Sequence, residues 1–265
     1  MPGFRTGRPD LSSGFEPTPD PPTPSGALYI FDARKPYGVI QSLADEERLT
    51  GWTNLGSSGI NATTDETYGG PLMRNFVTPN SKPALNLNGV TNSFALADKL
   101  SFVNQTGIFH MVAVFRKAEA LGIHAIISTL NFNQAANPGF WFSLSPSGGL
   151  YVYVGRDNLS ACVSYNSAFT WAPGTWKALE IAGDGTTFYA SQNLTSAYTT
   201  QGFANPPNAS GVAPFNARVL AFPSAVTTFG YNQGDFAALY IWDRKLTTGE
   251  RATLATYVSQ VWGVT

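Results

Sequence analysis

The sequence predicts an all-β fold, a two-sheet antiparallel sandwich with an extended N-terminal arm and one C-terminal helix. Short apolar segments recur along the chain, and turn residues separate them. Two segments, Gly107–Arg116 and Asp235–Asp243, are apolar on both faces, as expected of strands that are covered on both sides. Charged residues make up only 12% of the chain, about half the usual share, which suits many strands joined by turns.

The stretch from Pro83 to Lys117 organises the prediction. Residues Ala84–Asn88 alternate apolar with polar side chains, which is the period of a half-buried strand. Asn88-Gly89 is a strong hairpin signal because both residues tolerate positive φ, so Ser93–Leu96 is expected to return as the second hairpin strand. The apolar segment Gly107–Arg116 then predicts a central strand of a two-layer structure.

Further strands are expected on both sides of this stretch. They are Ala27–Asp32, His124–Thr129, Gly139–Ser145, Leu150–Val154, Ser160–Tyr165, Lys177–Ile181, Thr187–Ala190 and Arg218–Phe222. Trp52, in the segment Gly51–Thr63, is expected in the core because large aromatic side chains contribute most to burial.

The end of the chain predicts a strand followed by a helix. Asp235–Asp243 is the strand, and Thr247 with Glu250 three residues later forms a capping box. Apolar residues then recur at helical spacing from Leu254, and Gly263 ends the helix.

These patterns carry a resemblance to a known superfamily. The runs PALNLNGVTNSFAL and NQTGIFHMVAVFRK, and the closing run YIWDRKLTTGERATLATYVSQVWG, resemble the laminin G-like jelly roll of the concanavalin A-like lectin/glucanase superfamily. The resemblance extends over most of residues 27–265. This segment is similar to the plain laminin G-like modules found on phage particles. The resemblance implies a jelly-roll sandwich and indicates little about the ligand.

The N-terminal region differs from the rest of the chain. Residues 1–26 are rich in proline, which favours extended backbone and removes hydrogen-bond donors, so this segment reads as a disordered tail or as an extended arm. As an arm it would contact a neighbouring subunit through Phe4, Leu11 and Phe15. The jelly-roll domain is expected to cover residues 27–265.

Composition excludes several classes of function. The formal net charge is −1 with scattered basic residues, so no nucleic-acid partner is expected. The single Cys162 excludes an intramolecular disulfide framework. The N-terminus carries no apolar signal-peptide run and no stretch reaches the roughly 20 apolar residues of a membrane span, so we expect synthesis in a cytoplasm and no membrane partner.

Catalytic and metal signatures are weak. The glucanases of this superfamily use a Glu-x-Asp-x-x-Glu strand, which this sequence lacks, so no enzymatic activity is expected. Cys162 is expected to be a buried thiol and His110 a core histidine; with His124 they do not have the spacing of a zinc site. No cofactor is predicted. Calcium, which relatives hold with loop oxygens, is left open, and no ligand set is identified.

The remaining chemistry is sugar binding. Trp141, Tyr151 and Tyr153 lie on adjacent predicted strands and could stack on sugar faces. Amides in nearby loops, Asn158 together with Asn131 and Asn133, could bond hydroxyl groups. The alternative is that these aromatic side chains fill the sandwich or a subunit contact.

Two functional interpretations follow. The first is a virion structural protein, a phage capsid decoration or a head- or tail-fibre-type protein. It would be made in the host cytoplasm, held to other virion proteins by its arm, open to homo-oligomerisation, and turned outward toward host-surface glycans. The second is an extracellular, secreted or surface-bound bacterial glycan-binding adhesion module. A glycoside hydrolase is a weaker third alternative.

Overall fold

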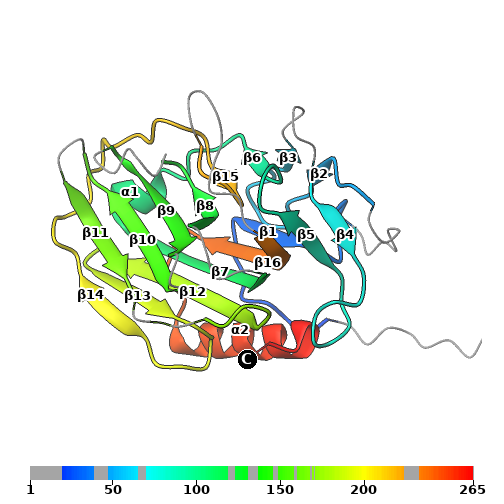
Figure 1. Ribbon diagram of the computed structural model, residues 1–265. Coiled ribbons are helices and arrows are strands. Elements are labelled where there is room, and N and C mark those ends of the chain that lie inside the picture. The colour runs from blue at the N-terminus through cyan, green and yellow to red at the C-terminus, as the bar shows by residue number, and fades with distance from the viewer. Residues whose placement is uncertain are drawn as a thin grey trace, which may run out of the picture.

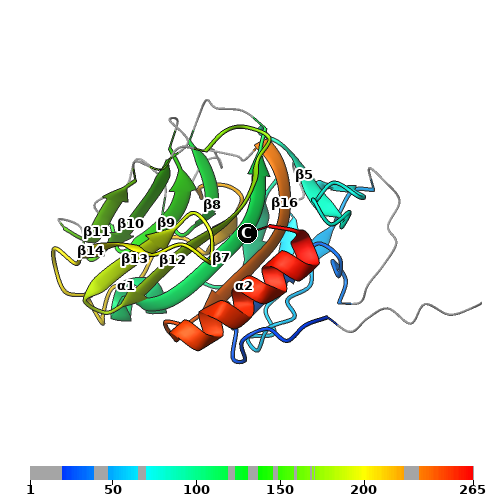
Figure 2. The ribbon, with the colours of Figure 1, turned by 90° about the horizontal axis from the view of Figure 1, so that it is seen from below.

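The computed structural model describes residues 20–38, 47–64, 70–118, 123–130, 137–145, 149–157, 160–167, 169, 171–223 and 233–264. In this part of the chain two antiparallel sheets pack face to face, and the long helix α2 (Thr248–Trp262) lies across the outer face of one of them (Figures 1 and 2). The predicted fold class, an all-β sandwich with a C-terminal helix, is confirmed.

The first sheet lies under α2. Its strands run in the order β14 (Thr199–Gly202), β13 (Thr187–Ser191), β12 (Trp176–Asp184), β7 (Ile108–Lys117), β16 (Gln233–Trp242), β5 (Ala84–Asn88) and β4 (Leu72–Arg74), and β1 (Tyr29–Asp32) also pairs with β16.

The second sheet forms the other layer. Its order is β11 (Ala161–Asn166), β10 (Leu150–Gly155), β9 (Gly139–Leu144), β8 (His124–Ser128), β15 (Arg218–Val219), β6 (Phe94–Leu96), β3 (Ala62–Thr64) and β2 (Gly51–Trp52). A short helix, α1 (Phe102–Thr106), which the sequence analysis did not predict, precedes β7.

The two strands predicted to be apolar on both faces are central in the first sheet. On β7, Met111, Ala113 and Phe115 face the second sheet, whereas Val112 and Val114 pack beneath α2. Both faces of β7 are therefore dry, which explains why its sequence shows no alternation of apolar and polar residues. Trp52 is 1% exposed in the core between the sheets, as predicted.

The predicted hairpin at Asn88-Gly89 is wrong. β5 pairs with β16 and β4 in the first sheet, whereas β6 pairs with β3 and β15 in the second. Both edges of β5 are occupied, so the chain after Gly89 crosses to the other layer. The side-chain oxygen of Asn88 accepts the backbone amides of Val90 and Thr91 and stabilises this crossing.

The predicted capping box at the start of α2 is confirmed. The Thr247 side chain accepts the Glu250 amide, the Glu250 carboxylate accepts the Thr247 amide, and Gly263 ends the helix at a φ of 70°. Among the described residues, no helix is both long and apolar enough to span a membrane.

Candidate functional site

The three aromatic residues predicted to bind sugar lie together on the outer face of the second sheet. Trp141 of β9 is in register with Tyr153 of β10, and their rings stack with centroids 4.5 Å apart and an interplanar angle of 19°. Tyr151 lies two residues before Tyr153 on the same face, and its ring meets Trp141 edge-on at 5.8 Å. Strand alternation and register therefore assemble the predicted group.

The three residues differ in exposure. Trp141 is only 1% exposed and Tyr153 6%, because Leu130 and Phe222 pack with them in a small hydrophobic cluster outside the main core. Burial raises the pKa of the Tyr153 phenol above its ordinary value. Trp141 and Tyr153 are thus buried packing residues, although they lie on the outer face of the second sheet and not inside the sandwich.

Tyr151 is the partly exposed member of the group. Its cross-strand partner on β11 is Asn166, and the partner of Tyr153 is Ser164; both residues are exposed at the edge of the sheet. An aromatic ring held by a buried indole, with an amide and a hydroxyl beside it, offers an apolar face and hydrogen-bonding groups on one surface.

The predicted loop amides give a different outcome. Asn158, Asn131 and Asn133 lie outside the described residues, as do the predicted arm residues Phe4, Leu11 and Phe15. Asn166 was not considered in the sequence analysis. The signal that could have identified it is its position directly after the expected strand Ser160–Tyr165, which follows the strand that carries Tyr151 in the sequence.

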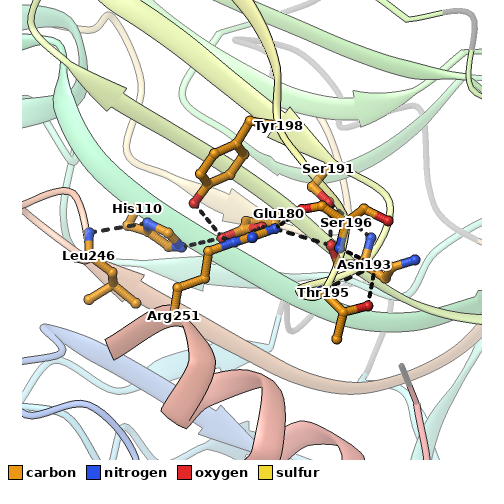
Figure 3. A network of polar contacts seen from close by, with 9 residues as sticks. All are labelled: His110, Glu180, Ser191, Asn193, Thr195, Ser196, Tyr198, Leu246 and Arg251. Carbon is orange, nitrogen blue, oxygen red and sulfur yellow. Dashed lines mark hydrogen bonds and ion pairs between the residues drawn. The ribbon is translucent and has the colours of Figure 1, made fainter. Parts of the chain in front are cut away.

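A second polar arrangement lies between the first sheet and α2 (Figure 3). The Glu180 carboxylate on β12 is fully buried and accepts hydrogen bonds from Arg251 of α2 and Tyr198, with Arg251 Nη2–Oε2 at 2.7 Å and Tyr198 Oη–Oε1 at 2.7 Å. His110 Nε2 lies 3.0 Å from Oε1 of the same carboxylate. The Arg251 guanidinium also lies 4.2 Å from the Tyr198 ring centroid.

The protonation states follow from the contacts. Burial alone would raise the pKa of Glu180, but the hydrogen bonds from His110 and Arg251 outweigh it, so the pKa lies below its ordinary value. His110 Nδ1 accepts the backbone amide of Leu246, which leaves Nε2 to carry the proton toward Glu180. Desolvation and the Glu180 charge raise the pKa of Tyr198.

This arrangement is suited to anchoring rather than to acid–base catalysis. An ionised, fully bonded carboxylate with no exposed oxygen is a poor proton donor and cannot reach a substrate. Its bonds join β7, β12, α2 and the segment after β13, so they position the helix. Sequence analysis missed this group. The signal was the acidic Glu180 within the expected strand Lys177–Ile181.

A groove runs along the side of α2 next to these residues. It has a volume of about 520 Å³, with Ala178 and Leu194 at its base and Arg251, Ala255 and Ser259 along the helix wall. Arg251 is the only charged side chain among the lining residues, and its charge is matched by buried Glu180.

The remaining candidates are the cysteine thiol and the side chains that could bind a metal ion. Cys162 is buried, as predicted, and desolvation raises the pKa of its thiol to about 11, so it is unreactive at neutral pH. Among the described residues, no group of three or more His, Cys, Asp or Glu side chains is arranged to hold a metal ion.

Comparisons with known proteins support the fold. No protein-family model matches the chain, and no curated protein matches its sequence. A Trypanosoma rangeli sialidase in complex with sialic acid matches with a TM-score of 0.53 and 13% identity over 92% of this chain and 34% of that chain. The carbohydrate-binding module CBM40 of a Ruminococcus gnavus IT-sialidase matches with a TM-score of 0.48 and 9% identity over 87% of this chain and all of the module.

These matches bear on architecture alone, because the identities are so low. The chain spans about a third of the length of the Trypanosoma rangeli sialidase. With the observed sheet order, the Trypanosoma rangeli sialidase match supports a jelly-roll-like β-sandwich fold.

Proposed function

We propose that this chain is a non-enzymatic glycan-binding protein and that the outer face of the second sheet binds the sugar. One observation carries the proposal: the partly exposed Tyr151 ring is held by buried Trp141 and has exposed Asn166 and Ser164 at its side. A pyranose ring presents C–H groups that stack on an aromatic face and hydroxyls that exchange hydrogen bonds with amides.

The role of each residue follows from its exposure. Tyr151 supplies the contact face, and Asn166 and Ser164 supply hydrogen bonds. Trp141 and Tyr153 act as positioning residues, because their stacked rings fix the orientation of Tyr151 without reaching solvent. Affinity at such an open, shallow surface is expected to be low for one sugar and to grow when several copies bind together.

The absence of catalysis is part of the proposal. Hydrolysis by a retaining mechanism needs two carboxyl groups about 5 Å apart, and an inverting mechanism needs about 6.5–9.5 Å. Glu180, the most deeply buried carboxylate described, is ionised and fully engaged by its partners. The test is incubation with the glycans that bind, with reducing-end release as the readout; turnover above buffer would contradict this part.

The setting of the activity is also a proposal. The low charge and the proline-rich arm favour a phage virion protein of the laminin G-like type, with an extracellular bacterial adhesion module as the alternative. Detection of the protein in purified particles, at a fixed ratio to the major capsid protein, would support the first setting; its absence from particles would contradict it.

Binding itself is tested on a glycan array. We expect the wild type to bind a restricted set of glycans, Tyr151→Ala to lose that signal, and Tyr151→Phe to retain most of it because the ring face is preserved. Exposed Val90, between β5 and β6, gives a control in Val90→Ala. An unchanged array signal for Tyr151→Ala would contradict the proposed surface.

A further inference from the structure

The groove beside α2 has a chemistry distinct from that of the proposed glycan surface. Its base is apolar and buried, with Ala178 0% and Leu194 4% exposed, and no aromatic side chain lines it. The exposed helix face that borders it carries Thr248, Ala252 and Thr256 and no charge. A groove of this kind lacks a stacking surface for sugar and suits apolar side chains.

The polar atoms in the groove include a donor and an acceptor that could form hydrogen bonds with a polypeptide backbone. Arg251 donates through Nε and Nη2 to Glu180 and through Nη2 to the Ser196 carbonyl, and its Nη1 donates no hydrogen bond within the described part of the chain. The Thr256 hydroxyl donates to the Ala252 carbonyl, which leaves its lone pairs outward. The groove therefore combines a donor and an acceptor with an apolar base.

The chain itself contains a segment of complementary chemistry. Nineteen residues precede Asp20, and they carry the apolar side chains Phe4, Leu11 and Phe15 among residues that favour extended backbone. Extended, 19 residues reach roughly 60 Å, whereas α2, with its 15 residues, is roughly 22 Å long. Proline carbonyls accept hydrogen bonds, which suits the unengaged Arg251 donors.

The arm begins on the side of α2 away from the groove. The Asp20 carboxylate bonds Arg34 at 2.7 Å, and Arg34 bonds the Tyr257 hydroxyl at 2.7 Å. Tyr257 lies two positions from Ala255, which is about 160° around the helix. Figure 2 shows β12 on one side of α2 and the chain after residue 20, in blue, on the other.

The direction of the arm favours a second copy as the acceptor. Pro21 and Pro22 follow Asp20, and Pro17 and Pro19 precede it, so this part of the sequence favours stiff, extended backbone over a sharp return around the helix. We propose that residues 1–19 of one copy bind the groove beside α2 of a second copy. Reciprocal exchange of the two arms closes a two-fold dimer.

Complementation between two full-chain variants tests this proposal. Ala252→Arg fills the groove at an exposed helix position and leaves the arm intact. A second variant combines Phe4→Ser, Leu11→Ser and Phe15→Ser and leaves the groove intact. Ser210→Arg, at an exposed turn outside the groove lining, is the matched control. Thermal unfolding verifies that each variant folds, and sedimentation velocity over a concentration series measures association.

We expect the wild type and Ser210→Arg to dimerise and each of the other variants to dimerise at least tenfold more weakly. An equimolar mixture of the two defective variants should form a 1:1 dimer through one arm–groove contact, because one variant supplies the arm and the other supplies the groove. This mixed dimer should be weaker than the wild-type dimer, which has two such contacts, and stronger than either variant alone. A monomeric wild type at about 100 µM, undiminished association of either variant, or failure of the folded variants to complement would overturn the proposal. None of these outcomes depends on glycan binding.

Discussion

At the scale of single residues, side-chain exposure distinguishes the residue proposed to contact the glycan from the residue that holds it in place. Tyr151 and Trp141 touch, yet Trp141 is 1% exposed and Tyr151 is partly exposed. A buried indole removed from a packed cluster leaves a cavity, whereas a half-exposed ring removed from a sheet surface leaves little. The two positions should therefore respond differently to the same substitution.

Trp141→Ala is expected to lower the free energy of unfolding by about 3–5 kcal/mol because it empties a buried site. Tyr151→Ala is expected to lower it by about 1 kcal/mol or less, as is usual for a partly exposed position. Urea unfolding monitored by circular dichroism measures both. Equal losses would show that Tyr151 is as much a packing residue as Trp141.

The Glu180 group shows what a buried charge requires. Its carboxylate has donors on strand, loop and helix, so each donor removed leaves an uncompensated charge away from water. The loss should be much larger than for a partly exposed pair such as Arg156–Asp157.

Arg251→Ala should destabilise the protein by about 3–5 kcal/mol because it strands the buried Glu180 charge. Adding Glu180→Gln should recover part of that loss, since the amide no longer carries a charge. Arg156→Ala, at the partly exposed pair, should change stability by at most about 1 kcal/mol. If the double variant were less stable than Arg251→Ala alone, Glu180 would not be the group that Arg251 neutralises.

At the scale of elements, local sequence patterns predicted the residue ranges of strands and helices better than they predicted which strands pair. The extents of β5 and β7 and the capping box of α2 follow from residues within one segment, so alternation and capping chemistry find them. The pairing of β5 with β16 joins residues about 150 positions apart and leaves no trace in the turn at Gly89. That is why the turn signal was present but the hairpin was absent.

The start of α2 gives a pH dependence with a defined sign. The hydrogen bond from Arg244, with that from the Thr247 amide, holds the pKa of Glu250 at about 2, below its ordinary 4.5. A depressed carboxyl pKa contributes stability that is present above about pH 4.5 and is lost as the pH falls toward 2. Glu250→Gln should therefore have a lower melting temperature than wild type at pH 7, with the difference shrinking toward pH 2. A constant difference across this range would contradict the assignment.

The loop between β4 and β5 carries a strained, exposed aromatic residue. Phe76 is 79% exposed and has a φ of 56°, a left-handed conformation that costs a non-glycine residue about 1–2 kcal/mol. Phe76→Asn should raise stability by up to about 1 kcal/mol, because asparagine tolerates this conformation and no packing is lost. Val90→Asn, also on an exposed loop position, should change it by less than about 0.5 kcal/mol. Calorimetric melting of both variants makes the comparison.

At the scale of the whole molecule, the two layers present different surfaces. The first sheet is covered by α2, which leaves the groove beside the helix, whereas the second sheet presents Tyr151 and Asn166 at its β10–β11 edge. The proposed glycan surface and the proposed arm-binding groove thus lie on opposite layers of the sandwich. A dimer formed through the arms would leave both glycan surfaces free for binding to a multivalent target.

The sequence allowed the aromatic part of the candidate site to be predicted, because its residues are close together in the chain. Trp141, Tyr151 and Tyr153 lie on strands that follow one another, so their proximity is nearly local. The burial of Trp141 and Tyr153 depends on Phe222, some 70 to 80 residues away, and so could not be deduced. His110, Glu180 and Arg251 are separated by about 70 residues each, and only the folded topology brings them together.

The most direct test of the central claim is calorimetric titration of the strongest array glycan into wild type, Tyr151→Ala, Tyr151→Phe and Asn166→Ala, with melting temperatures taken in the same buffer. The account predicts saturable binding to wild type and Tyr151→Phe, at least tenfold weaker binding to Tyr151→Ala and Asn166→Ala, and melting temperatures that stay close together. Wild-type affinity in a folded Tyr151→Ala protein would show that the glycan does not bind through this face.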